Sequence, residues 1–145
     1  MSVLHIRDVG MHNQVETRIR NRIAEVENVA EIVSQFCATH NLSNELLVAF
    51  GVSLDEALSN IIRCAYEDEG EHSILVRLEY KLGSVAATVE DDGLPFNPLL
   101  VPALDLASPD RDRGFGIHFI RNLMDDVRYV RRNGINRLEM CKRIV

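Results

Sequence analysis

Residues 53–66 read SLDEALSNIIRCAY, and this stretch decides the fold because it predicts a long helix with two different faces. Apolar side chains recur at helical spacing from residue 47 to residue 65, which is typical of a helix that lies on a hydrophobic layer. The apolar stripe consists of Leu47, Leu54, Leu58, Ile61 and Ala65, with Phe50 beside it.

The opposite face of this helix carries two polar residues. Glu56 and Asn60 lie one helical turn apart, about 6 Å along the axis. The residues that border them are small: Ala49, Ser53, Ala57 and Cys64. Small neighbours leave room for a ligand, although a solvated Glu–Asn pair would also explain this face if the stretch stood alone.

Length and composition predict one globular domain over residues 1–145 with an ordinary hydrophobic core. The formal net charge of -6 argues against binding nucleic acid or an anionic membrane through a general electrostatic field. The 3 cysteines form no CxxC pair, so neither a disulfide framework nor a zinc site is expected. Without a signal peptide or an apolar run of about 18 residues, we expect a cytoplasmic protein.

Periodicity along the rest of the chain predicts further strands and helices. Expected strands are 3–8, 15–22, 73–82, 84–92, 127–132 and 135–144, and expected helices are 25–40, 43–68 and 114–125. Gly83 and the pair Asn133-Gly134 are expected in tight turns. This order predicts an α+β fold, a two-layer α/β sandwich with helices on one face of a mainly antiparallel sheet.

Asp91 is in phase with the buried side chains of its strand. Val85, Ala87 and Val89 share one face at a period of two, and Asp91 comes next on that face, whereas Asp92 lies on the other. A buried carboxylate is costly unless it is paired or hydrogen-bonded. Asp91 therefore needs a donor, and no basic residue of its own strand supplies one.

A long segment rich in proline follows this strand. All 4 prolines lie between residues 95 and 109, and the charged run 110–113 comes next. Loops longer than about 12 to 15 residues are usually functional lids or linkers, so we expect a lid over residues 94–113. The glycines of Gly114-Phe115-Gly116 then open a helix, where free backbone amides favour phosphate. Alone, these glycines also fit a flexible entry to a packed helix.

Three stretches together resemble the N, G1 and G2 boxes of the GHKL ATPase and kinase superfamily, whose ATP-binding domain has the Bergerat fold. They are residues 55–66, 89–98 and 114–125. Over about residues 15–145 the chain is most similar to the anti-sigma serine-protein kinases. Two residues depart from the usual boxes: Cys64 stands where many relatives have His, and Pro95 stands at the second Gly of DxGxG. Pro is common there in the anti-sigma branch, and we expect Cys64 to be a small packing residue.

The resemblance implies ATP and Mg²⁺ as ligands. It implies that Asn60 holds the Mg²⁺ that bridges the phosphates, and that Glu56 is the general base toward the incoming hydroxyl. Asp91 would accept a hydrogen bond from the adenine amino group, and Gly93 would let the backbone approach the base. Phosphate contacts would come from Arg113, Gly114, Phe115 and Gly116, with Arg111 in place of Arg113 or a solvated lid charge as the alternatives.

The resemblance further implies an ATP-dependent serine/threonine protein kinase of the anti-sigma factor type. Its expected substrate is a STAS-type anti-anti-sigma protein, sequestration of a sigma factor is a second expected role, and a homodimer is the expected assembly. The alternative is a weakly catalytic or non-catalytic ATP-binding module that acts by sequestering its partner. A two-component histidine kinase domain is disfavoured because the 5 histidines are scattered and no helical hairpin carries a phospho-acceptor. Hydrolytic ATPase use, as in chaperone and mismatch-repair relatives, is disfavoured because no further domain is expected.

Overall fold

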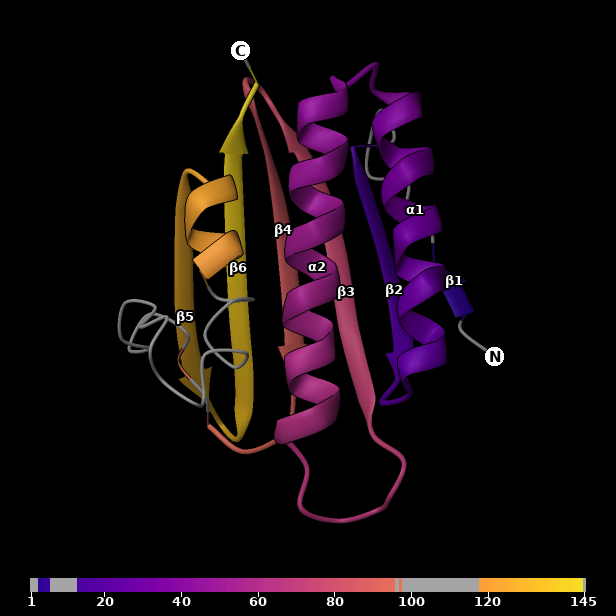
Figure 1. Ribbon diagram of the computed structural model, residues 1–145, viewed down its shortest axis with the longest axis vertical. Coiled ribbons are helices and arrows are strands. Elements are labelled where there is room, and N and C mark those ends of the chain that lie inside the picture. The colour runs from indigo at the N-terminus through magenta and orange to yellow at the C-terminus, as the bar shows by residue number, and fades with distance from the viewer. Residues whose placement is uncertain (1–2, 6–12, 96, 98–117, 145) are drawn as a thin grey trace, which may run out of the picture.

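The structure is a computed structural model that describes residues 3–5, 13–95, 97 and 118–144 (Figure 1). Its strands are β1 (Val3–His5), β2 (Gln14–Arg20), β3 (Ser73–Lys81), β4 (Ser84–Asp91), β5 (Asp126–Arg132) and β6 (Ile135–Arg143). Its helices are a short 3-10 turn η1 (Ile23–Glu25), α1 (Val26–Thr39), α2 (Asn44–Cys64) and a helix at 118–123. No helix among these residues is long and apolar enough to cross a membrane.

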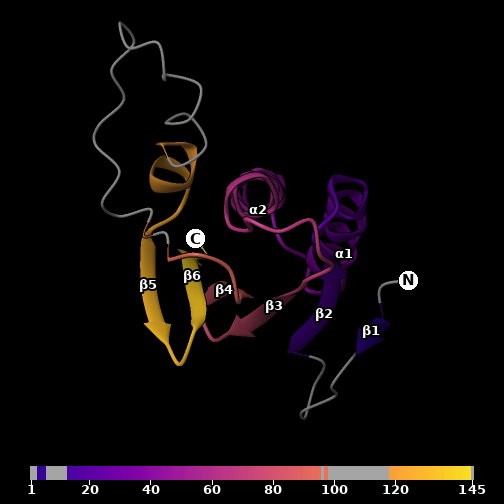
Figure 2. The same cartoon turned by 90° about the horizontal axis from the view of Figure 1, so that it is seen from below.

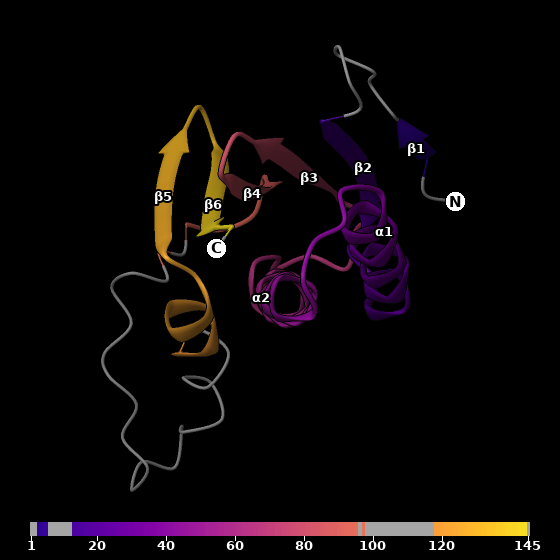
Figure 3. The same cartoon turned by 90° about the horizontal axis from the view of Figure 1, so that it is seen from above.

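The strands form one sheet in the order β1-β2-β3-β4-β6-β5, and every neighbouring pair is antiparallel. Helices α1, α2 and 118–123 all lie on the same side of this sheet (Figures 2 and 3). The expected α+β two-layer sandwich is therefore confirmed. The tight turns are also confirmed, because Gly83, Asn133 and Gly134 adopt the positive φ values of 82°, 53° and 77°.

Helix α2 packs against β4 and α1 through a broad buried stripe. Ser43 caps its first turn, since the hydroxyl accepts a hydrogen bond from Leu46 N at 3.3 Å. The expected division of its faces is partly wrong. Ala49, Ser53 and Ala57 are only 1%, 0% and 4% exposed, so these small residues face the core and not the polar side. The reason is that α2 meets the sheet and α1 together, which widens its buried arc.

The end of α2 differs from the prediction: the helix ends at Cys64, four residues before Asp68. Two contacts explain the early stop. The carbonyl of Ala65 accepts a hydrogen bond from Leu94 N at 2.8 Å, and the Asp68 carboxylate accepts one from Gly70 N at 2.7 Å, forming a local turn. Cys64 is exposed, so its expected role as a packing residue is wrong as well.

Strand register brings the end of β4 next to the start of β6. In the β4–β6 pair, Asp91 is the direct partner of Asn136. Directly opposed residues of an antiparallel pair point to the same face, so both side chains lie on the face that the helices cover. This position is where the candidate site begins.

Candidate functional site

The centre of the site is the Asp91 carboxylate, which is only 6% exposed at the end of β4. Its Oδ1 accepts hydrogen bonds from Gly93 N at 2.9 Å and from Asn136 Nδ2 at 3.0 Å. Both bonds end on Oδ1, so Oδ2 takes neither of them. The burial of Asp91 on the inner face, predicted from the strand pattern, is confirmed.

The electrostatics of Asp91 are set by opposing effects. Burial raises the pKa of the carboxyl, because desolvation penalises the charged form. The hydrogen bonds from Asn136 and Gly93 N and the nearby Arg131 guanidinium act in the other direction and lower the pKa. Two hydrogen bonds and one nearby positive charge thus offset part of the cost of burying this carboxylate.

Asn136 is a site residue that the sequence analysis missed. It is 5% exposed on β6, and besides Asp91 its Nδ2 lies 3.1 Å from Gly93 O and 3.0 Å from Leu94 O. One signal was available: Asn136 alternates in phase with the buried Leu138 and Met140 of its strand. The same signal, a polar residue at a buried position of an alternating strand pattern, identified Asp91 but was not applied to Asn136.

Gly93 lies where its backbone segment comes close to the end of α2. A Cβ added at this position would lie 2.6 Å from Ala65 Cβ and 2.7 Å from Ala65 O. The structure therefore gives a packing reason for glycine at this position, next to the end of α2. Its predicted contact with a nucleotide base stays a prediction.

Helix α2 places Glu56 and Asn60 on the border of its buried stripe, where both residues are half-buried. The Asn60 Nδ2 is buried and has no hydrogen-bond partner within the described part of the chain. An unpaired buried amide is unfavourable by itself. Helix α2 packs against β4, the strand that ends at Asp91.

His72 contacts several groups that follow α2 and β4 in the sequence. Its ring stacks on Tyr66 with centroids 4.1 Å apart, its Nε2 lies 2.8 Å from Asp68 Oδ1, and its Nδ1 lies 3.5 Å from Asp92 Oδ1. The hydrogen bond to Asp68 raises the pKa of His72. Burial and the nearby Asp91 and Asp92 raise the pKa of Tyr66.

The predicted phosphate contacts Arg113, Gly114, Phe115 and Gly116 lie outside the described residues, as do Arg111 and most of the lid. The described helix at 118–123 follows them directly. Ile120 and Met124 anchor this part of the chain to the core, with 1% and 6% exposure. The structure thus describes α2 and the surroundings of Asp91, and the phosphate contacts stay a prediction.

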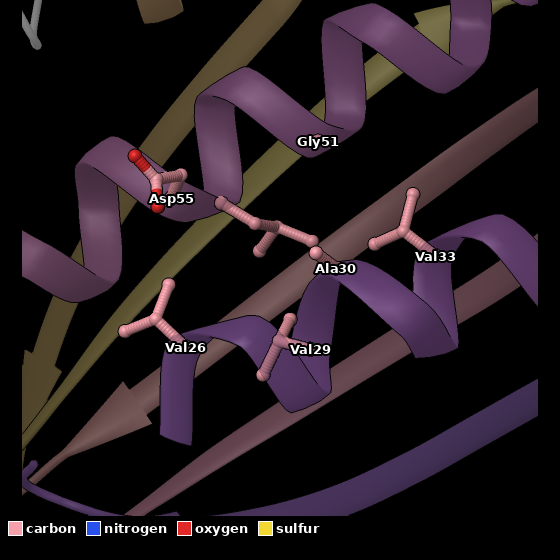
Figure 4. Close-up of a pocket in the computed structure, with 7 residues that line it drawn as sticks. Val26, Val29, Ala30, Val33, Gly51 and Asp55 are labelled. Atoms are coloured by element: carbon pink, nitrogen blue, oxygen red, sulfur yellow. The ribbon is translucent and has the colours of Figure 1, made fainter. Parts of the chain in front are cut away.

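A separate groove lies between α1 and α2 (Figure 4). It is lined by Val26, Val29, Ala30, Val33, Gly51, Leu54 and Asp55. Asp55 is the single charged residue of this lining. Neither Asp91 nor Asn60 belongs to it, so this groove and the site around Asp91 are distinct.

Comparison with known proteins identifies the family of this domain. The sequence profile of the histidine kinase-like ATPase domain matches residues 19–142. The matched range contains α1, α2, the Asp91–Asn136 pair and the unpaired amide of Asn60. No curated protein matches the chain. The chain belongs to the family of histidine kinase-like ATPase domains in the GHKL superfamily, whose members are ATP-binding modules.

Proposed function

We propose that this protein is an ATP-dependent serine/threonine protein kinase of the anti-sigma factor type. The observation that carries the proposal is the border of α2, where a half-buried carboxylate at Glu56 lies one turn from the unpaired amide of Asn60. That helix packs against the strand that ends at the buried Asp91. A base, a metal ligand and an acceptor for adenine would thus stand on two packed elements.

The described residues fit ATP with Mg²⁺. Asp91 Oδ2 takes neither hydrogen bond of the carboxylate, so it can accept one from the exocyclic amino group of adenine. The Asn60 side chain can turn its amide oxygen to Mg²⁺, a cation that binds oxygen ligands and shares them with phosphates. Arg113 and the amides of residues 114–116 would meet the phosphates.

Glu56 would act on the substrate hydroxyl. When bound, Mg·ATP supplies the phosphoryl group and the metal charge that neutralises the phosphates. The Glu56 carboxylate would orient the serine or threonine hydroxyl of the partner and take its proton as the oxygen attacks. Asn60 would hold the metal in position, and Asp91 would hold the adenine base. Together with Glu56, these residues would align the substrate hydroxyl with the phosphoryl group.

The partners follow from the resemblance of the boxes at 55–66, 89–98 and 114–125 to those of anti-sigma kinases. We infer a STAS-type anti-anti-sigma protein as substrate and a sigma factor as a sequestered partner, with a homodimer as the active assembly. The 3 cysteines are unpaired, and free thiols suit a reducing compartment. We therefore infer that the protein works in the cytoplasm.

The test is phosphoryl transfer from labelled ATP to a STAS-type protein encoded near the gene. We expect Glu56→Gln to lower transfer by about 10²- to 10⁴-fold while Mg·ATP binding stays within a few fold, because the change keeps shape and removes basicity. Asn60→Ala should weaken Mg·ATP binding and transfer together. Asp55→Asn is the matched control, since Asp55 is exposed on the same helix.

Two results would change the assignment. If Glu56→Gln transfers phosphate as fast as the parent protein, Glu56 is not the base. If the parent protein binds ATP and a sigma factor but transfers phosphate to no STAS-type partner, the alternative function, an ATP-binding module that sequesters its partner, replaces the kinase.

A further inference from the structure

Asn136 has the most connected side chain of the described site. Its Nδ2 faces three acceptors, namely Asp91 Oδ1 at 3.0 Å, Gly93 O at 3.1 Å and Leu94 O at 3.0 Å. Its Oδ1 accepts a hydrogen bond from Arg131 Nη1 at 2.8 Å and a short one from the Tyr129 hydroxyl. Both ends of this buried amide are therefore used.

The orientation of the amide is fixed by the chemistry of its neighbours. Arg131 carries only donors, so it can face the oxygen of Asn136 and not the nitrogen. The same guanidinium nitrogen also donates to Gly93 O at 2.9 Å. Reversing the amide would point Oδ1 at the Asp91 carboxylate and at two carbonyl oxygens. The hairpin β5–β6 thus presents a preset donor to the end of β4.

We propose that Asn136 is a positioning residue for the nucleotide base. It holds Oδ1 of Asp91, so that Oδ2 is the oxygen offered to the base, and it holds the backbone at residues 93–94 through their carbonyls. The inference rests on the proposed binding of ATP. It assigns base selectivity to the β5–β6 hairpin in addition to β4.

The consequence for selectivity follows from hydrogen-bond direction. An ionised carboxylate is an acceptor only, so it favours a purine with an amino group at the 6-position and disfavours one with a keto oxygen there. Without Asn136, the Asp91 carboxylate loses one of its two donors among the described residues and can rotate. The carbonyls of residues 93 and 94 lose the Asn136 amide, and only Arg131 still donates to Gly93 O. Selectivity for the amino group should then fall more than nucleotide affinity in general.

The experiment compares ATP with purine riboside 5′-triphosphate, which lacks the 6-amino group, by calorimetry. In the parent protein we expect the analogue to bind about 10- to 150-fold more weakly, the value of one charge-assisted hydrogen bond. In Asn136→Ala this ratio should fall about tenfold, mainly through weaker ATP binding. Arg137→Ala is the control, because Arg137 is the next residue of β6 and pairs with Glu90 on the other face.

A second measurement needs no nucleotide. The amide of Gly93 donates to Asp91, and that of Leu94 donates to Ala65 O. Hydrogen exchange at both amides should become faster in Asn136→Ala and stay unchanged in Arg137→Ala. Where Asn136→Ala does not fold, Tyr129→Phe removes one hydroxyl that orients the amide, and it should shift the ratio and the exchange in the same direction by less.

The outcomes separate the inference from the proposed function. An equal loss of affinity for both nucleotides, with an unchanged ratio, would overturn the role of Asn136 while ATP binding stands. Unchanged exchange at residues 93 and 94 would also overturn it. A parent protein that binds neither nucleotide would overturn the proposed function and the base-positioning role with it.

Discussion

Asp91 must satisfy two conditions that oppose each other. Its burial would let it contact the proposed nucleotide base away from water, and the same burial raises the pKa of the carboxyl. Because the carboxyl has a raised pKa in the folded state, it lowers stability as pH rises from the unfolded value of about 3.9 through the folded value. The hydrogen bonds from Asn136 and Gly93 N and the nearby charge of Arg131 reduce this cost.

At this residue scale we expect Asp91→Asn to weaken ATP binding by about 10- to 150-fold. The reason is the loss of the charge from a charge-assisted hydrogen bond, which contributes about 1.5 to 3 kcal/mol. Asp92→Asn should hardly change binding, since Asp92 is exposed and belongs to the opposite face of the strand. Calorimetry with Mg·ATP on both variants measures the difference, and equal losses would contradict the assignment.

At the scale of elements, the sequence predicted the parts of the fold that depend on local patterns. Periodicity gave α2 and β3–β4, and residue preference gave the Asn133-Gly134 turn. The end of α2 was predicted wrongly, because it depends on a contact between Ala65 and the distant Gly93 and Leu94. The small residues of α2 were placed on the wrong face because the packing of α1 against α2 cannot be read from one helix.

In the candidate site, too, local sequence patterns predicted some features, and contacts between distant segments decided the others. The pattern of β4 alone predicted that Asp91 is buried. Asn136 was missed because its partner is 45 residues away, and only the register of β4 with β6 brings the two together. Periodicity singled out Glu56 and Asn60 and placed them opposite the apolar stripe, and resemblance gave them their roles. The structure places both residues at the border of the stripe.

Two glycines of very different surroundings test the packing at the end of α2. We expect Gly93→Ala to lower the free energy of unfolding by about 1 to 3 kcal/mol, because the new methyl group overlaps the backbone of Ala65. Gly51→Ala is the control within α2: nothing lies within 4 Å of its added Cβ, and alanine is the better helix former by about 1 kcal/mol. Urea unfolding should show opposite signs for the two variants, and destabilisation of both would refute this account.

On the scale of the whole molecule, His72 ties together segments that are distant in the sequence. Its backbone N–H donates to Asn21 Oδ1 at 2.8 Å, and Asn21 N donates to His72 O at 3.0 Å, which joins the start of β3 to the end of β2. Its ring contacts Tyr66, Asp68 and Asp92, which follow α2 and β4. A change in the charge of this one ring therefore acts on side chains that follow α2 and β4.

The direction of the pH effect follows from the raised pKa of His72, whose main cause is the hydrogen bond to Asp68. A group with a raised pKa in the folded state contributes stability that is fully present below its unfolded pKa, about 6.5, and that is lost as pH rises through the folded value. We expect the urea midpoint of the parent protein to fall over this window relative to that of His72→Gln. His118→Gln, which changes an exposed histidine, should keep the parent's slope. Parallel curves for the parent and His72→Gln would show that the stacked ring and its two carboxylates do not couple stability to pH.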